Sequence, residues 1–365
     1  MTASVVALTH RNFRLIWFGL LASFTGSFMQ NAALLWHVSL LVPPERRGLA
    51  LGFVGLSKVV PVVVFSVIAG VLADAWDRRK LMVVTQALSM LVAAALAALT
   101  FAGLVAVWPL YLLAALGAAV GAFDLPARQA LVPTLVPRAH LPNAISLNSI
   151  MLQTASIAGP AAAGFVIAGA GVGWVYVANA VSFGAVIMAV QMMRGVSGRI
   201  EDVDTPGRVS WHAAREGLRF VFTQPLMRST MLLDFLATFF ASATALLPIF
   251  AQDILHVGAR GYGWLFAAPA IGSFLTSAAM VPLIESIERR GATLLWAIVG
   301  HGAATIVFGV SRSFWLTFGC LAFIGATDTI STVIRNIVRQ LETPDRLRGR
   351  MTGINMVFFQ GGPQL

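Results

Sequence analysis

Apolar segments of about 20 residues recur along the whole chain and restrict its possible folds more than any other feature. A helix of this length crosses the hydrocarbon core of a bilayer, which is about 30 Å thick. Because lipid offers the backbone no hydrogen-bond partners, such segments must form helices. We therefore predict an all-α integral membrane protein, with spans at residues 13–38, 50–73, 81–101, 107–123, 144–168, 174–193, 229–251, 262–284, 292–310 and 314–334.

Composition and charge support this prediction. Hydrophobic residues make up 58% of the chain and charged residues only 11%, whereas about 25% of a soluble domain is charged. In a soluble protein a net charge of +10 would suggest nucleic-acid binding. Here the basic residues lie in short loops between apolar segments, which favours a lipid bilayer over nucleic acid as the partner.

The distribution of basic residues predicts the orientation of the chain. Cytoplasmic loops of membrane proteins are enriched in Lys and Arg. If the N-terminus is cytoplasmic, all but five of the 25 Lys and Arg residues fall on the cytoplasmic side. The exceptions are Lys58, within the second span, and four outer residues, Arg46, Arg47, Arg260 and Arg312. We therefore expect a multi-pass protein with a cytoplasmic N-terminus.

The longest polar stretch, residues 194–228, divides the chain into domains. Its second part has apolar residues at helical spacing, which is typical of an amphipathic helix on the membrane surface. We expect an N-terminal six-helix bundle over 1–193, a cytoplasmic linker with this helix over 194–228, and a C-terminal bundle over 229–365. The second bundle is expected to be incomplete, with helices seven to ten and part of an eleventh that ends at Leu365.

The two halves of the sequence resemble each other. Arg128 and Asn148 match Arg335 and Asn355 at a constant offset of 207 residues. These matches fall at equivalent ends of apolar segments, which suggests a parallel repeat of six spans. Parallel repeats around a site at the membrane midplane are one of the known transporter designs.

The loop between the second and third spans carries a distinctive pattern: Gly70 and Asp74 in GVLAD, then Arg78 and Arg79 in RRK. It resembles the signature loop of the major facilitator superfamily. The family pattern has Gly where this chain has Asp77, and that difference is similar to the branch of multidrug, macrolide and enterobactin-type exporters. The motif FDLPARQA over residues 123–130 also resembles this branch.

The resemblance implies the major facilitator fold, two pseudo-symmetric six-helix halves, here with the last one and a half helices missing. It also implies a bacterial-type inner membrane location and alternating access. In that scheme Asp74, Arg78 and Arg79 belong to an inner gate. The alternative interpretation is that these residues are ordinary charges that set the topology.

Asp124 and Arg128 lie four residues apart, so they share a helix face and can form an ion pair. Three interpretations are open for them: part of the inner gate, a proton carrier, or a structural pair. In the second half of the chain, Asp328 is the expected counterpart of Asp124, and Arg335 follows it seven residues later. Ionisable residues inside membrane spans are functional candidates by default.

Three polar residues are candidates for the substrate cavity: Gln30, Asn31 and Lys58. A lysine deep in a span is costly unless it faces water or a partner. Lys58 therefore either contacts an anionic substrate or has a structural partner, or its side chain extends towards the interface. Gln30 and Asn31 either contact the substrate or form hydrogen bonds between helices.

Two further features are assigned to packing. Gly159, Pro160 and Gly164 in the fifth span are similar to the Gly-Pro motif of drug–proton antiporters, and we expect them to pack helices together. His301 lies in the ninth span, which the resemblance places on the outside of the bundle, so we expect a structural role for it.

The sequence contains no residues spaced for metal binding, no phosphate-binding glycine loop and no nucleophile–base set. We therefore expect no cofactor, no enzymatic activity and transport driven by a gradient. The predicted function is secondary active transport: a monomeric, proton-coupled exporter of small hydrophobic or amphipathic compounds, of drug or siderophore type. The alternative is a truncated membrane protein that does not transport, or an interaction partner of other membrane proteins.

Overall fold

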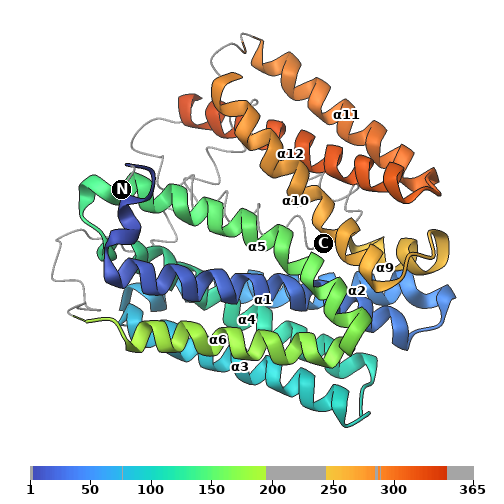
Figure 1. Cartoon of the computed structure of the whole chain (residues 1–365), viewed down its shortest axis with the longest axis horizontal. Helices are drawn as coiled ribbons and strands as arrows, with labels where there is room; N and C mark the ends of the chain where they lie inside the picture. Colours follow the sequence, from blue (N-terminus) through green and yellow to red (C-terminus); the bar gives the residue numbers. More distant parts are fainter. Residues whose placement is uncertain (1–2, 76, 195–243, 284–286, 288, 343–365) are drawn as a thin grey trace. The chain divides into compact units, whose positions relative to one another are not determined.

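The computed structural model describes residues 3–75, 77–194, 244–283, 287 and 289–342. Helices dominate these residues, as the sequence predicts (Figure 1). The chain divides into two compact units. Unit 1 comprises Met1–Asp204 and Val257–Ala267, and unit 2 comprises Thr205–His256 and Ala268–Leu365.

Unit 1 contains the six helices expected from the first six apolar segments. Short 3₁₀ turns and a one-residue turn connect several of them. The six helices are α1 (Arg11–Leu41), α2 (Arg47–Ala75), α3 (Arg78–Phe101), α4 (Val107–Leu131), α5 (Leu141–Ala170) and α6 (Val172–Gln191).

Two of the connections have clear local causes. The side chain of Asp77 caps α3 by accepting hydrogen bonds from the backbone N–H groups of Arg79, at 2.9 Å, and Lys80, at 3.1 Å. Such a cap contributes about 1 kcal/mol. Gly171 is the single residue between α5 and α6, and its φ of 95° is one that glycine adopts without strain.

The helices of unit 1 form one bundle. α1 packs against α5 and α6, α2 against α4, and α3 against α4 and α6. At one end of the bundle the buried core includes Phe13, Ile16 and Leu20 of α1 and Met82 of α3. Large apolar side chains on the outer faces are exposed, which is expected where lipid is the solvent.

Unit 2 contains the remaining helices that the structure describes. They are the part of α10 (Gly258–Leu283) from Ala268 onwards, α11 (Arg290–Val310) and α12 (Phe314–Glu342), preceded by a short irregular helix over Thr244–Ile254. α11 and α12 pack along each other. Residues 229–243 of the seventh predicted span, the linker from 195 onwards and the predicted eleventh span lie outside the described residues.

Eight helices in the described part of the chain are long and apolar enough to cross a membrane. They correspond to predicted spans two to six and eight to ten. α1 has 31 residues but is not among the eight. Its interior carries polar residues, including Gln30 and Asn31, and these lower its mean hydropathy. In this respect α1 differs from the other five helices of unit 1, which are among the eight.

Candidate functional site

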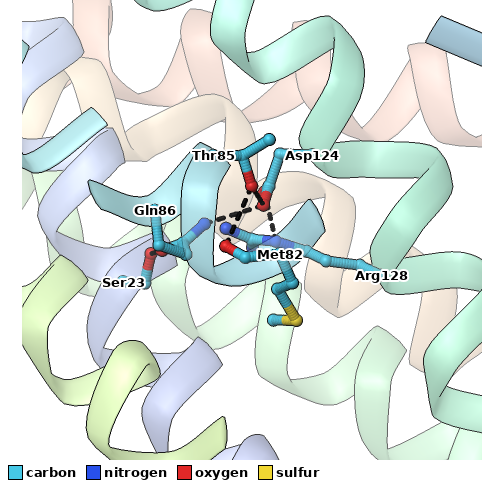
Figure 2. A network of polar contacts seen from close by, with 6 residues as sticks. All are labelled: Ser23, Met82, Thr85, Gln86, Asp124 and Arg128. Carbon is cyan, nitrogen blue, oxygen red and sulfur yellow. Dashed lines mark hydrogen bonds and ion pairs between the residues drawn. The ribbon is translucent and has the colours of Figure 1, made fainter. Parts of the chain in front are cut away.

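The predicted pair on α4 is the centre of a buried polar network (Figure 2). Asp124 and Arg128 form an ion pair through the Asp124 carboxylate and Arg128 Nε, so the predicted pairing is confirmed. The other carboxylate oxygen accepts hydrogen bonds from Thr85 Oγ1, at 2.9 Å, and Gln86 Nε2, at 2.8 Å, both on α3. Both oxygens of this carboxylate are therefore bonded inside unit 1.

The network extends to α1. Ser23 Oγ donates a hydrogen bond to Gln86 Oε1 at 3.4 Å, and the Arg128 guanidinium lies 4.5 Å from the centre of the Phe24 ring. Asp124 and Arg128 are both buried. The network therefore joins α1, α3 and α4 around one neutralised charge pair. These contacts hold the Asp124 carboxylate in one orientation between the three helices.

A second polar group joins α1 and α2. Lys58 Nζ donates a hydrogen bond to Asn31 Oδ1, and both side chains are half-buried. Lys58 lies 11 residues after the start of α2, and Asn31 lies ten residues before the end of α1. At a rise of 1.5 Å per residue, both lie about 15 Å from those helix ends. The pair is therefore close to the expected midplane of the membrane.

The hydrogen-bond partner of Gln30 is on α6, whereas that of Asn31 is on α2. Asn179 Nδ2 on α6 donates a hydrogen bond to Gln30 Oε1 at 2.8 Å. Asn179 and Ser182 pack so closely against Gly26 that a Cβ at Gly26 would lie 2.5 Å from either side chain. The amide of Gln30 thus makes an interhelical hydrogen bond, which was one of the two interpretations that the sequence left open.

The signature loop lies where α2 ends and α3 begins. Gly70 and Asp74 are in the last turns of α2, and their side chains lie outside the described part of the structure. Arg78 is the first residue of α3. Arg79 Nη2 donates a hydrogen bond to the backbone carbonyl of Gln191 at 3.1 Å, at the C-terminal end of α6. A cation is favoured there by the helix dipole.

The Gly-Pro motif of α5 lies at two close helix contacts. A Cβ at Gly159 would lie 2.6 Å from the Cβ of Phe28 on α1. A Cβ at Gly164 would lie 2.6 Å from the carbonyl oxygen of Ala259 and 2.9 Å from Cα of Gly263, both in the first turns of α10. Glycine thus permits backbone contact at both positions. Pro160 is buried beside them.

Unit 1 also contains an aromatic cluster that was not predicted from the sequence. The hydroxyl of Tyr262, in the first turns of α10, donates a hydrogen bond to the carbonyl of Ala32 at 2.8 Å. Its ring lies 5.0 Å from that of Trp36, and Tyr176 is hydrogen-bonded to His37 at 3.1 Å. The chain has only three tyrosines, and this scarcity in an apolar sequence was the available signal.

Unit 2 carries its own polar set, on α11 and α12. Arg335 donates hydrogen bonds to Ser331 Oγ at 2.8 Å and to Thr332 Oγ1 at 3.0 Å. Asp328 is exposed one turn before Ser331. His301 Nδ1 on α11 lies 3.4 Å from Thr327 Oγ1 on α12. Within the part of the chain that the structure describes, no group of three or more potential metal ligands occurs.

The long apolar helices and the buried polar networks between them indicate the class of protein to which this chain belongs. Apolar helices that bury ion pairs and polar networks at membrane depth are typical of polytopic membrane proteins that move solutes. The sequence profile of the transmembrane secretion effector family matches residues 2–364, and the chain belongs to this family of the major facilitator superfamily. It is accordingly a membrane transporter of small molecules and not an enzyme.

Known proteins agree with this assignment. The chain is 28% identical over 360 residues to the multidrug efflux pump Tap of Mycolicibacterium fortuitum, covering 96% of this chain and 86% of Tap. It is 26% identical over 298 residues to the enterobactin exporter EntS of Escherichia coli O1:K1, covering 79% and 68% of the two chains. Both relatives are bacterial exporters by name.

Solved structures show the same fold. The nucleoside transporter NupG aligns with a TM-score of 0.72 at 11% identity, covering 97% of this chain and 88% of NupG. A bacterial homologue of the iron transporter ferroportin, in its inward-facing state, aligns with a TM-score of 0.65 at 15% identity, covering 96% and 91%. The predicted major facilitator fold is thus confirmed.

Proposed function

We propose that this protein is a secondary active exporter of small hydrophobic or amphipathic compounds, which works by alternating access and is driven by proton antiport. The observation that carries the proposal is the Lys58–Asn31 pair, a polar group near the membrane midplane on helices α1 and α2. Transporters of this design bind their substrates at that depth. The names of the two bacterial relatives support efflux as the direction.

We assign substrate contact to Asn31 and Lys58. The Lys58 ammonium has three N–H donors, and the described bond to Asn31 uses one of them. The ammonium can therefore also donate to an oxygen atom of a substrate. Gln30 has its carbonyl oxygen bonded to Asn179, so we assign it a supporting role in holding α1 against α6.

We assign the inner gate to the signature loop and to the neighbouring end of α4. Gly70, Asp74, Arg78 and Arg79 would supply the loop. Asp124 and Arg128 would hold α3 and α4 in place beneath it through the buried network. Asp328 and Arg335 are the proposed counterparts in the second half.

The protein would act as a monomer in a bacterial inner membrane, with its N-terminus in the cytoplasm. Its halves would be residues 1–193 and 229–365, joined by the linker 194–228. Cysteine labelling from the outside tests this topology: a cysteine at Arg312 should react, and one at Arg138 should not.

The function is tested by efflux of ethidium, a fluorescent amphipathic cation. Bacterial cells that lack their own efflux pumps, and that express this chain, should accumulate less ethidium than cells with an empty vector. A proton ionophore should abolish the difference, because it dissipates the driving gradient. Unchanged accumulation would contradict export of this probe, and efflux that resists the ionophore would contradict proton coupling.

The gate is tested in the same cells with Asp74→Asn, which is nearly the same size but uncharged. The variant should insert in the membrane at wild-type levels and lose most of its efflux activity. Arg312→Gln, a charge change on an exposed loop residue, is the matched control and should leave efflux unchanged. Normal efflux by Asp74→Asn would show that the loop charges only set topology.

A further inference from the structure

Three arginines from different elements meet at one end of unit 1, where α1 begins and α6 ends (Figure 1). Arg11 is the first residue of α1, Arg79 is the second residue of α3, and Arg194 lies three residues after the end of α6. Arg11 and Arg194 are exposed, and Arg79 is half-buried. We call these three residues the arginine cluster. Each lies one or two residues outside a predicted span, which places the cluster at the boundary between lipid and water.

Two of the guanidinium groups are held by neighbouring backbone carbonyls at the end of α6. Arg11 Nη1 donates a hydrogen bond to the carbonyl of Met192, and Arg79 Nη2 donates one to the carbonyl of Gln191, both at 3.1 Å. These carbonyls belong to consecutive residues, whose Cα atoms are about 3.8 Å apart, so the two nitrogens lie within about 10 Å of each other. The two guanidinium groups are therefore close enough to contact the same small molecule.

Arg194 is joined to this place through its backbone. Asn12 Nδ2 donates a hydrogen bond to the Arg194 carbonyl at 2.8 Å, and the backbone N–H group of Arg194 donates to Asn12 Oδ1 at 3.3 Å. This pairing holds Arg194 against the start of α1, beside the residue that follows Arg11. Its guanidinium group makes no hydrogen bond or ion pair with the residues that the structure describes.

Most of the N–H donors of the arginine cluster are unused. A guanidinium group has five N–H donors, and the described contacts use one from Arg11, one from Arg79 and none from Arg194. None of the three is ion-paired with a residue in the described ranges. Asp77, close to Arg79 in the sequence, uses its Oδ1 atom to cap α3. Three cations with unused donors favour an anion that has several oxygen acceptors, and phosphate is such an anion.

Exposed apolar side chains lie on the membrane side of the arginine cluster. Phe18 on α1 and Met188 on α6 are both more than half exposed. The two helices touch beside them, because a Cβ at Gly19 would lie 3.1 Å from the Cβ of Ala189. Phe18 and Met188 precede these two residues, so they lie at the same level of the bundle. An acyl chain can cover this apolar surface while a headgroup contacts the arginines, whereas a free phosphate ion cannot.

We propose that the arginine cluster binds the phosphate of an anionic phospholipid of the phosphatidylglycerol type, with an acyl chain against Phe18 and Met188. Basic residues at the membrane surface attract anionic lipids. The bound headgroup connects the ends of α1, α3 and α6, so the lipid binds the folded protein and stabilises it. Arg79 also belongs to the proposed gate loop, and the test therefore leaves Arg79 unchanged.

The experiment measures lipid binding to the purified full chain in a neutral detergent by native mass spectrometry. The chain is titrated with phosphatidylglycerol and, separately, with phosphatidylcholine, which has the same acyl chains and no net charge. The test variant combines Arg11→Gln with Arg194→Gln. The control combines Arg289→Gln with Arg312→Gln, which removes the same charge from two exposed residues of unit 2.

The wild type and the control should bind phosphatidylglycerol more tightly than phosphatidylcholine. The test variant should bind phosphatidylglycerol about 25-fold more weakly, because each arginine near an anionic lipid contributes about fivefold. Arg194→Gln alone should weaken binding about fivefold, and its guanidinium group has no described contact whose loss could unfold the protein. Unchanged affinity in both variants, or an equal loss in the control, would overturn the proposal.

Two further comparisons distinguish a lipid from other partners of the arginine cluster. An excess of inorganic phosphate should not displace phosphatidylglycerol from the wild type. If it does, the cluster is a site for free phosphate and the lipid proposal is wrong. Equal affinities of the wild type for the two lipids would show that other groups of the chain, such as carboxylates of the linker, neutralise the cluster, and this result would also overturn the proposal.

Discussion

The buried pair on α4 provides a quantitative test of the structure. Asp124→Asn removes the negative charge and leaves the Arg128 guanidinium buried, with no carboxylate beside it. Breaking a buried ion pair by removing one partner costs about 3–5 kcal/mol. The two hydrogen bonds from Thr85 and Gln86 can persist to the asparagine oxygen, although they lose their charge-assisted part.

The second variant is Arg128→Met, which leaves Asp124 with two hydrogen-bond donors, and the third is the double variant. Because the double variant contains no buried charge at this place, it should be more stable than Asp124→Asn alone. The double variant should be about 1–3 kcal/mol more stable than the sum of the two single effects predicts. Arg312→Gln, on an exposed loop residue, should change stability by less than about 0.5 kcal/mol.

The assay is reversible unfolding of the purified protein in mixed micelles with an increasing fraction of a denaturing detergent, followed by helical circular dichroism. The free energy of unfolding of the four proteins gives the double-mutant cycle. If the effects of the two substitutions simply add, the charges do not interact in the folded protein, and the network described for α1, α3 and α4 is wrong.

Two further substitutions test the close contacts of α10 with the same unfolding assay. Gly164→Ala should lower the free energy of unfolding by about 1–3 kcal/mol, because its Cβ would meet the Ala259 carbonyl at 2.6 Å. Gly169→Ala, in the same helix with open space around it, should not be destabilising, and equal losses would contradict the contact. Tyr262→Phe should cost about 1 kcal/mol by removing the hydrogen bond to Ala32, and an unchanged free energy would show that this bond does not contribute to stability.

The helices were predictable because lipid imposes a simple rule on sequence. Spans two to six and eight to ten could be located from apolar length alone, since a spanning helix needs about 20 apolar residues. The pairing of Asp124 with Arg128 was also predictable, because residues four apart on a helix are neighbours.

Contacts between distant helices were not predictable in the same way. Thr85 and Gln86 carry no pattern that connects them to Asp124, which is almost 40 residues later. The partner of Gln30 is 149 residues away on α6. Helical periodicity identifies the residues that share a face, whereas the neighbouring helix at that face is decided by the packing of the whole bundle.

The hydrogen-bond partner of His301 was unpredictable for the same reason. Thr327 Oγ1, which lies 3.4 Å from His301 Nδ1, is on the next helix.

The polarity of α1 has a consequence for how the protein is made. The composition of α1 alone does not qualify it as a spanning segment. Its principal partners, α5 and α6, are synthesised more than 100 residues later, and Asn179 on α6 is needed to satisfy Gln30. We therefore expect α1 to enter the bilayer inefficiently from the translocon and to depend on later helices for stable insertion. Membrane integration of this protein would then be completed only after most of unit 1 has been translated.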